Sequence, residues 1–128
     1  MGYKLRQLEI SIMELLARGV NAKEASVVLG LRERDLTMVR QAAVLNYPEV
    51  ESFRHLFCEA VRAGAISLPE YPSLDFLPAS QIKRLSRMAR GNVEYGTKIM
   101  TICNSATSGF EWELLDQVLA AAISQELI

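Results

Sequence analysis

The sequence predicts an all-α fold of about seven helices, and three observations favour this class. Hydrophobic residues recur at steps of three and four positions along most of the 128-residue chain, which is the spacing of an amphipathic helix. No segment shows the apolar–polar alternation of a half-buried strand more clearly than it shows the helical spacing. Half of the residues are hydrophobic, so the chain can bury a core and is not expected to be disordered.

Three parts are expected to follow one another along the chain. Residues 1–64 are predicted to form a helical domain that contains a helix-turn-helix. Residues 65–78 contain three prolines, which forbid a continuous helix, and their aromatic and aliphatic content suggests an ordered linker over the core. Residues 79–128 are predicted to form a C-terminal helical region packed on the first domain. The similarity of Leu15–Gly19 to Arg87–Gly91 hints at a degenerate second helix-turn-helix in that region.

The helices of the first domain are expected to begin and end at residues that cap them. The first helix should end at Arg18 and Gly19, because glycine suits the left-handed residue that follows a helix. Asn21 then offers an N-cap for the second helix, with Glu24 at the spacing of a capping box. The next helices are expected to end near Gly30, to run from about Arg32 to Asn46, and to run from Pro48 to Gly64.

Three more helices are expected after the proline-containing linker. The first of them begins at about Ala79 or Ser80 and runs to Arg90, where Gly91 ends it. Ser108 and Glu111 have the spacing of a second capping box, which places the start of the last helix close to them. The last two helices are expected over Val93–Asn104 and Phe110–Glu126.

Residues 21–41 carry the spacing of a helix-turn-helix. Such a motif needs a small residue where the second helix crosses the first, a residue that tolerates positive φ in the turn, and apolar residues that lock the two helices together. Ser26 lies four positions before Gly30, which supplies the turn. An ordinary helical corner shares much of this spacing and is the alternative. The apolar positions that would lock the motif are Ala25, Val28, Leu29, Leu31, Leu36 and Val39.

The second helix of this motif is the expected DNA-reading element. Residues near the N-terminus of that helix reach base edges in this class of protein, so Arg34 and Thr37 are expected to contact bases. The carboxylates of Glu33 and Asp35 repel phosphates, so a solvated face with ion pairs is the alternative. The other residues expected to contact DNA are Lys23, Arg32 and Arg40, through phosphates, and Gln41.

Charge is distributed unevenly, although the net charge is only −1. Residues 1–46 and 79–98 carry net charges of +2 and +4, whereas residues 47–78 and 99–128 carry −3 and −4. In the second basic segment, four cations repeat at helical spacing opposite an apolar face. Such a stripe either contacts phosphates or is simply exposed to solvent. Its members, which we expect to contact DNA, are Lys83, Arg84, Arg87 and Arg90.

The run Met13–Gly19, followed by Asn21–Val39, resembles the helical region of the flagellar master-regulator subunits FlhD and FlhC. It also resembles related activator subunits carried on bacterial integrative and conjugative elements. The resemblance implies a transcription activator subunit from a mobile genetic element. In that family, two kinds of subunit form a hetero-oligomer that binds double-stranded DNA upstream of promoters and recruits RNA polymerase. The chain is therefore expected to act with a second regulator subunit or with itself, without the cysteine-rich zinc site of the FlhC type.

The sequence offers no set of residues suited to catalysis. His55 lies one helical turn from Glu51 and Glu59, but no third ligand or nucleophile is spaced to complete a catalytic or metal site. Cys58 and Cys103 lie far apart in apolar patterns, so they are expected to be buried free thiols rather than a disulfide or metal ligands. We therefore expect no enzyme activity, no metal site and no cofactor.

The N-terminal sequence and the hydropathy pattern both predict a cytoplasmic protein. Residues 1–6 enter a charged amphipathic stretch and lack the apolar segment of a signal peptide. No apolar run approaches the roughly 18 to 20 residues needed to span a bilayer. No membrane partner is expected.

The main alternative function is a non-enzymatic adaptor or chaperone that binds a protein partner without touching DNA. Its binding surface would be the broad apolar face of the last helix, unless that face packs within the domain. The residues expected on this partner surface are Phe110, Trp112, Leu115, Leu119 and Ile123.

Overall fold

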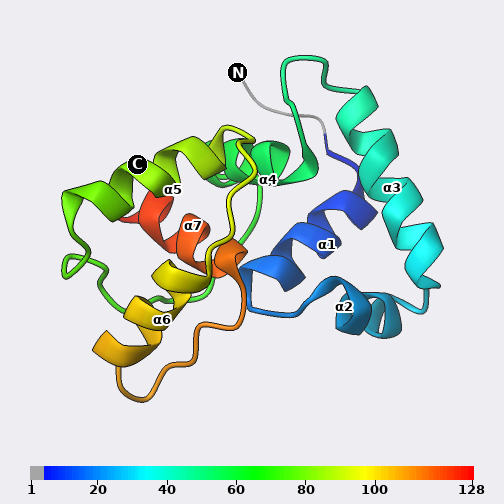
Figure 1. Cartoon of the computed structure of the whole chain (residues 1–128). Coiled ribbons are helices and arrows are strands. Elements are labelled where there is room, and N and C mark those ends of the chain that lie inside the picture. The colour runs from blue at the N-terminus through cyan, green and yellow to red at the C-terminus, as the bar shows by residue number, and fades with distance from the viewer. Residues whose placement is uncertain (1–4) are drawn as a thin grey trace.

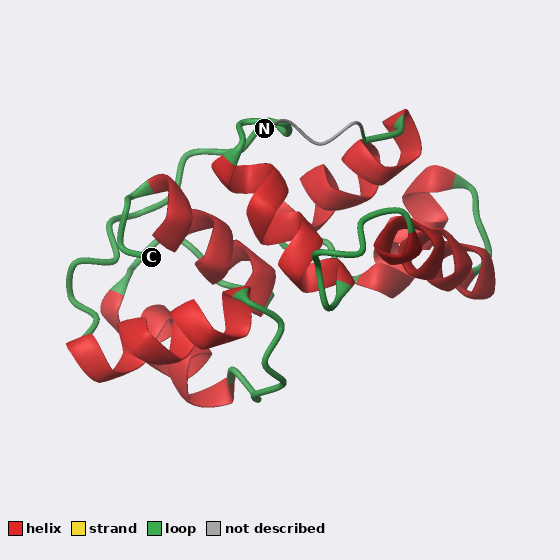
Figure 2. Ribbon diagram, turned by 90° about the horizontal axis from the view of Figure 1, so that it is seen from above, coloured by secondary structure: helices red, strands yellow, loops and turns green. Residues whose placement is uncertain are grey.

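A computed structural model describes residues 5–128, which form α-helices and connecting loops without any strand (Figures 1 and 2). The all-α class predicted from the sequence is confirmed. Met1–Lys4, the beginning of the segment inspected for a signal peptide, lie outside the described residues. The helices are α1 (Gln7–Ala17), α2 (Ala22–Leu29), α3 (Glu33–Leu45), α4 (Phe53–Arg62), α5 (Ala79–Ala89), α6 (Thr97–Ala106) and α7 (Leu115–Ser124).

The caps expected between α1 and α3 are present. Asn21 Oδ1 accepts a hydrogen bond from the Glu24 N–H at 2.9 Å, which satisfies one free donor in the first turn of α2. Gly30 ends α2 with φ of 68°, a conformation that costs a residue with a side chain but not glycine. The Leu31 N–H then donates to the Ser26 carbonyl at 2.8 Å, so the chain turns sharply into α3.

α7 lies at the centre of the core. It packs against α4 and α1, and every residue from Gln117 to Ile123 is buried. Helices α1, α2 and α3 contact one another pairwise, and α4 joins this group to α5. α3 and α5 therefore lie at opposite ends of the molecule, with the core helices between them (Figures 1 and 2).

The proline-containing segment 65–78 crosses the core without forming a helix. The Tyr71 hydroxyl donates to the Ala17 carbonyl at 2.5 Å, which ties the segment to the end of α1. The Gln125 side chain donates to the Pro72 carbonyl at 2.9 Å and accepts from the Leu74 N–H at 2.8 Å. Leu74 is fully buried, so this segment contributes to the same core as the helices.

Three helices begin later than the sequence predicted. α4 begins at Phe53 rather than in the turn that contains Pro48, because the Ser52 side chain caps it by accepting from the His55 N–H at 3.1 Å. α6 begins at Thr97 rather than Val93, because residues before it are held by contacts to α5 that are described below.

The start of α7 also differs from the prediction, and side-chain hydrogen bonds explain why. The Asn104 side chain makes two hydrogen bonds to the backbone of Trp112: it accepts from the N–H at 2.8 Å and donates to the carbonyl at 3.1 Å. These bonds keep the backbone around Trp112 extended. The Gln117 side chain then accepts from the N–H groups of Glu113 and Leu114, at 2.6 and 3.0 Å. The helix therefore begins at Leu115, and the expected capping by Ser108 and Glu111 does not occur.

Candidate nucleic-acid interface

The corner between α2 and α3 has the small, buried crossing residue that the motif requires. Ser26 is buried, and its hydroxyl donates to the Lys23 carbonyl at 2.6 Å instead of remaining unsatisfied. Ala25 and Leu36 are buried on either side of the turn, and Val39 is partly buried against the core. The prediction for Val28 was wrong: its side chain is 64% exposed on the outer side of α2.

α3 presents one long face that no other helix covers. Five of its exposed side chains lie at helical spacing, so they form a strip along α3, which lies at the edge of the molecule (Figure 1). The strip is polar near the start of α3 and apolar near its end, where Leu45 is 82% exposed. The Thr37 hydroxyl donates to the Glu33 carbonyl at 3.1 Å and can also accept from a ligand. The strip, here called the outer α3 face, consists of Arg34, Thr37, Met38, Gln41 and Leu45.

Arg32, by contrast, is engaged within its own helix turn. Its guanidinium makes two hydrogen bonds to the Asp35 carboxylate, with Nε–Oδ2 at 2.9 Å and Nη2–Oδ1 at 3.2 Å. These bonds lower the pKa of Asp35 below its ordinary value. Arg32 would have to give up this ion pair, or share it, to contact a phosphate. Lys23 is exposed on α2.

Arg40 points away from the outer α3 face and toward α4. Its guanidinium carbon lies 5.2 Å from the centroid of the Phe53 ring, in a cation–π contact. It lines two adjoining clefts, one of which also contains Thr37 and Gln41, whereas the other contains Arg54. One cleft is therefore lined by Thr37, Arg40 and Gln41. Arg34 lies nearer the N-terminus of α3 and does not line this cleft.

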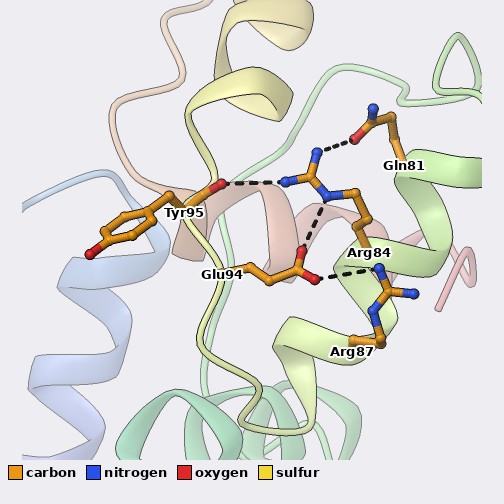
Figure 3. A network of polar contacts seen from close by, with 5 residues as sticks. All are labelled: Gln81, Arg84, Arg87, Glu94 and Tyr95. Carbon is orange, nitrogen blue, oxygen red and sulfur yellow. Dashed lines mark hydrogen bonds and ion pairs between the residues drawn. The ribbon is translucent and has the colours of Figure 1, made fainter.

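The basic stripe on α5 is partly neutralised by a residue from the following loop (Figure 3). Arg84 Nε lies 3.1 Å from one Glu94 carboxylate oxygen, and Arg87 Nη2 lies 3.4 Å from the other. The hydrogen bond from Arg84, followed by that from Arg87, lowers the pKa of Glu94 below its ordinary value. Arg84 also donates to the Gln81 side chain at 3.0 Å. The other members of the stripe, Lys83 and Arg90, are exposed.

Sequence reasoning overlooked Glu94, although a signal for it was available. It is the single acidic residue in the basic segment 79–98, and it follows the turn at Gly91 that reverses the chain. The ion pairs of Glu94 with two arginines hold the loop between α5 and α6 in place. The neighbouring Val93 and Tyr95 side chains are 92% and 88% exposed. The same contacts explain why α6 begins only at Thr97.

The apolar face of α7 is buried inside the domain. The prediction that this face is an exposed partner-binding surface was therefore wrong. Trp112, Leu119 and Ile123 are buried, and Phe110 and Leu115 are partly buried against the core. The Trp112 ring stacks on Tyr71 with centroids 5.9 Å apart and lies 4.6 Å from Phe110. These side chains pack within the domain, which was the other interpretation of the pattern.

His55, Cys58 and Cys103 occupy structural positions. His55 Nδ1 accepts from the Glu51 N–H at 3.1 Å, and its Nε2 lies 3.8 Å from Glu59. Both cysteines are buried free thiols, as predicted. Burial raises the pKa of Cys58 to about 12 and that of Cys103 to about 11, so neither is an activated thiolate at neutral pH.

Within residues 5–128, no helix is long and apolar enough to cross a bilayer. In the same part of the chain, no three or more histidine, cysteine or acidic side chains gather closely enough to hold a metal ion.

Comparison of the chain with profiles of known families, with curated proteins and with solved structures finds no match. The resemblance to the flagellar regulator subunits stays a prediction. The case for a function therefore depends on the residues themselves.

Proposed function

We propose that this chain is a DNA-binding transcription regulator that reads duplex DNA with the outer α3 face. The observation that carries the proposal is the placement of α3 at the edge of the molecule (Figure 1), together with the exposure of Arg34, Thr37 and Gln41 at helical spacing. A helix must be free along one side to enter the major groove, and its first turns must carry side chains that can bind base edges.

Arg34 and Thr37 take the role of base contacts in this proposal. Arg34 is exposed, and within residues 5–128 no carboxylate pairs with it, so it can donate two hydrogen bonds to one guanine without losing a partner. Gln41 lies one turn beyond Thr37 and can bind adenine in the same way. Met38, between them, would contact a thymine methyl group.

The exposed cations Lys23, Lys83 and Arg90 are assigned to phosphates. Arg32, Arg84 and Arg87 are secondary candidates, because each would first have to leave the carboxylate it binds. An arginine that must first break an ion pair contributes less binding free energy from a phosphate contact than a cation without a carboxylate partner does. The effective basic surface is therefore smaller than the number of lysines and arginines implies.

The chain is proposed to act as one subunit of an oligomer, either with itself or with a second regulator subunit. One α3 reads only a few base pairs, and helix-turn-helix proteins reach useful specificity by placing two such helices one turn of DNA apart. The resemblance to flagellar activator subunits favours a hetero-oligomer that contacts RNA polymerase. The face of α7 is buried, so the exposed Val27 and Val28 of α2, outside the outer α3 face, are better candidates for that interface.

A salt-dependent binding titration tests the proposal. The full chain is titrated against a duplex from the region upstream of its own gene, alone and with the products of neighbouring genes, at several salt concentrations. We expect the logarithm of the affinity to fall linearly with the logarithm of the salt concentration, because bound phosphates release counterions. Arg62→Ala is the matched control, since Arg62 binds Glu59 at 2.7 Å on α4 and has no assigned role. No binding at about 50 mM salt would contradict the proposal.

A further inference from the structure

A second feature of the molecule, beside the outer α3 face, has the composition of an anion site. A cleft of about 280 Å³ lies between α3, the first turn of α4 and the turn that follows α5. Its lining combines apolar side chains from the core with five polar ones. The polar lining residues are Arg40, Ser52, Arg54, Asn92 and Asp116.

Arg40 is the unusual residue of this cleft. Within residues 5–128 no carboxylate pairs with it, and its Nε atom is buried without a hydrogen-bond partner. A buried donor without an acceptor is costly, and Arg40 as a whole is only partly buried, so its Nη donors remain open to an anionic ligand. The contact with Phe53 fixes the plane of the guanidinium against the cleft wall.

The residues that line the cleft carry one more positive charge than negative. Arg54 uses its Nε for the Asp116 carboxylate at 3.2 Å, which leaves its two Nη groups for other acceptors. Arg40 and Arg54 against Asp116 give the lining of this cleft a net charge of +1. Glu51 is not among the lining residues, but its Oε2 atom would lie 3.1 Å from a Cβ on Gly91, so its carboxylate is close to the edge of this cleft. The charge of the lining residues alone matches the single negative charge of a phosphodiester.

The backbone around the cleft adds donors to those of the arginines. The N–H groups of the first α4 residues, Phe53 and Arg54, have no acceptor within the helix. The Ser52 hydroxyl oxygen accepts from His55, so its proton is free to be donated. Gly91 has φ of 100°, and a Cβ there would lie 3.1 Å from the Glu51 Cβ, so glycine allows the turn after α5 to approach this helix end closely.

We propose that this cleft binds one phosphate group, held by the guanidinium groups of Arg40 and Arg54. Two sources share this chemistry: a backbone phosphate of DNA that flanks α3, which rests on the proposed function, and a free phosphate-bearing small molecule. The cleft lies on the α4 side of α3, next to the outer α3 face, where a DNA strand would run if α3 entered the major groove.

The first arm of the test uses inorganic phosphate and the ¹⁵N-labelled full chain at constant ionic strength. We expect saturable changes in the amide signals of residues 52–54 and 91–92. Arg40→Gln should weaken the response by at least about tenfold. Arg62→Gln, a matched control on α4, should leave it unchanged. Asn92→Asp places a carboxylate in the exposed part of the cleft without disturbing the core and should also weaken it, which covers the case in which Arg40→Gln does not fold.

The second arm separates the two sources by DNA titration. If DNA supplies the phosphate, Arg40→Gln should reduce the slope of log affinity against log salt by about 0.9, while Arg34→Ala acts on sequence preference. A phosphate response without any effect of Arg40→Gln on DNA binding, or without DNA binding at all, assigns the cleft to a free phosphate-bearing ligand. A wild-type chain whose cleft signals do not respond to phosphate overturns this inference, even if α3 binds DNA normally.

Discussion

α3 and α5 both carry arginines and lie at opposite ends of the molecule, and they use these arginines differently (Figure 1). The Arg34 side chain on α3 extends into solvent without a carboxylate partner in residues 5–128. Arg84 and Arg87 on α5 share the Glu94 carboxylate, and in doing so they fix the loop before α6 (Figure 3). Among the described residues, α3 leaves Arg34 without a carboxylate partner, whereas α5 uses two of its arginines to hold the following loop.

The difference teaches that counting cations overstates a nucleic-acid surface. Region 79–98 has the higher net charge, +4, but two of its arginines are occupied. Region 1–46 has only +2, yet it contains Arg34 and Arg40, neither of which has a carboxylate partner in the described part of the chain. Availability of a cation depends on its three-dimensional neighbours, and here the decisive neighbour comes from a loop.

The largest expected effect is on stability, and it compares a buried residue of α7 with an exposed residue of α3. Leu119→Ala should lower the free energy of unfolding by about 2 to 5 kcal/mol, because it leaves a cavity in the core. Met38→Ala, on the outer α3 face, should change it by less than about 0.5 kcal/mol. Urea unfolding monitored by circular dichroism measures both. Equal, small effects would contradict the burial of Leu119 in the core.

A smaller effect is expected on DNA affinity, from a substitution on α3 that should leave stability unchanged. Arg34→Ala should weaken DNA binding by about 1 to 3 kcal/mol, the usual value for a bidentate base contact, while leaving the melting temperature unchanged. Anisotropy titration and thermal melting of the same sample provide the two readouts. A folded Arg34→Ala chain that binds DNA as tightly as wild type would remove Arg34 from the interface.

The N-cap of α2 gives a further, moderate effect on the motif itself. Asn21→Ala removes the hydrogen bond to the Glu24 N–H and should cost about 1 kcal/mol of stability. Asn21→Ser keeps a capping oxygen and should lose much less. If the two variants melt at the same temperature, the cap does not contribute to holding α2 against α3.

The smallest expected effect is on the pH dependence of stability, and it tests the pairing of Glu94 with the arginines of α5. The pKa of Glu94 is lowered by Arg84 and Arg87, so this carboxylate contributes stability at neutral pH and loses it as the pH falls through the lowered pKa. Wild type should therefore lose slightly more stability than Glu94→Gln between about pH 5 and pH 3. Parallel melting curves for the two chains over that interval would contradict the pairing.

Local spacing was sufficient to predict the fold class and the α1–α3 region. Capping residues such as Asn21 and Gly30 act on their immediate neighbours, so their effect can be inferred from a few positions of sequence. The start of α4 follows from a local cap of the same kind by Ser52, which the sequence prediction overlooked, whereas the start of α7 could not be inferred in this way. Gln117 and Asn104 reshape the backbone through bonds to residues several positions away, which compete with helix propensity.

The candidate site was predictable in type but not in detail. Ser26 at the crossing position follows from spacing alone, and the structure buries it. The exposure of Val28, the orientation of Arg40 toward Phe53 and the occupation of Arg84 by Glu94 all depend on tertiary contacts. Such contacts join distant or opposing elements, and a helical period carries no information about them.

Mapping of DNA contacts by NMR tests the central claim most directly. A duplex that binds the ¹⁵N-labelled chain is added in steps, and the change in each amide signal is recorded. The account predicts that the largest changes fall on Arg34, Thr37 and Gln41, with little change at Arg84, Arg87 and Glu94. Changes concentrated on α5 and the loop after it, with α3 unaffected, would contradict it.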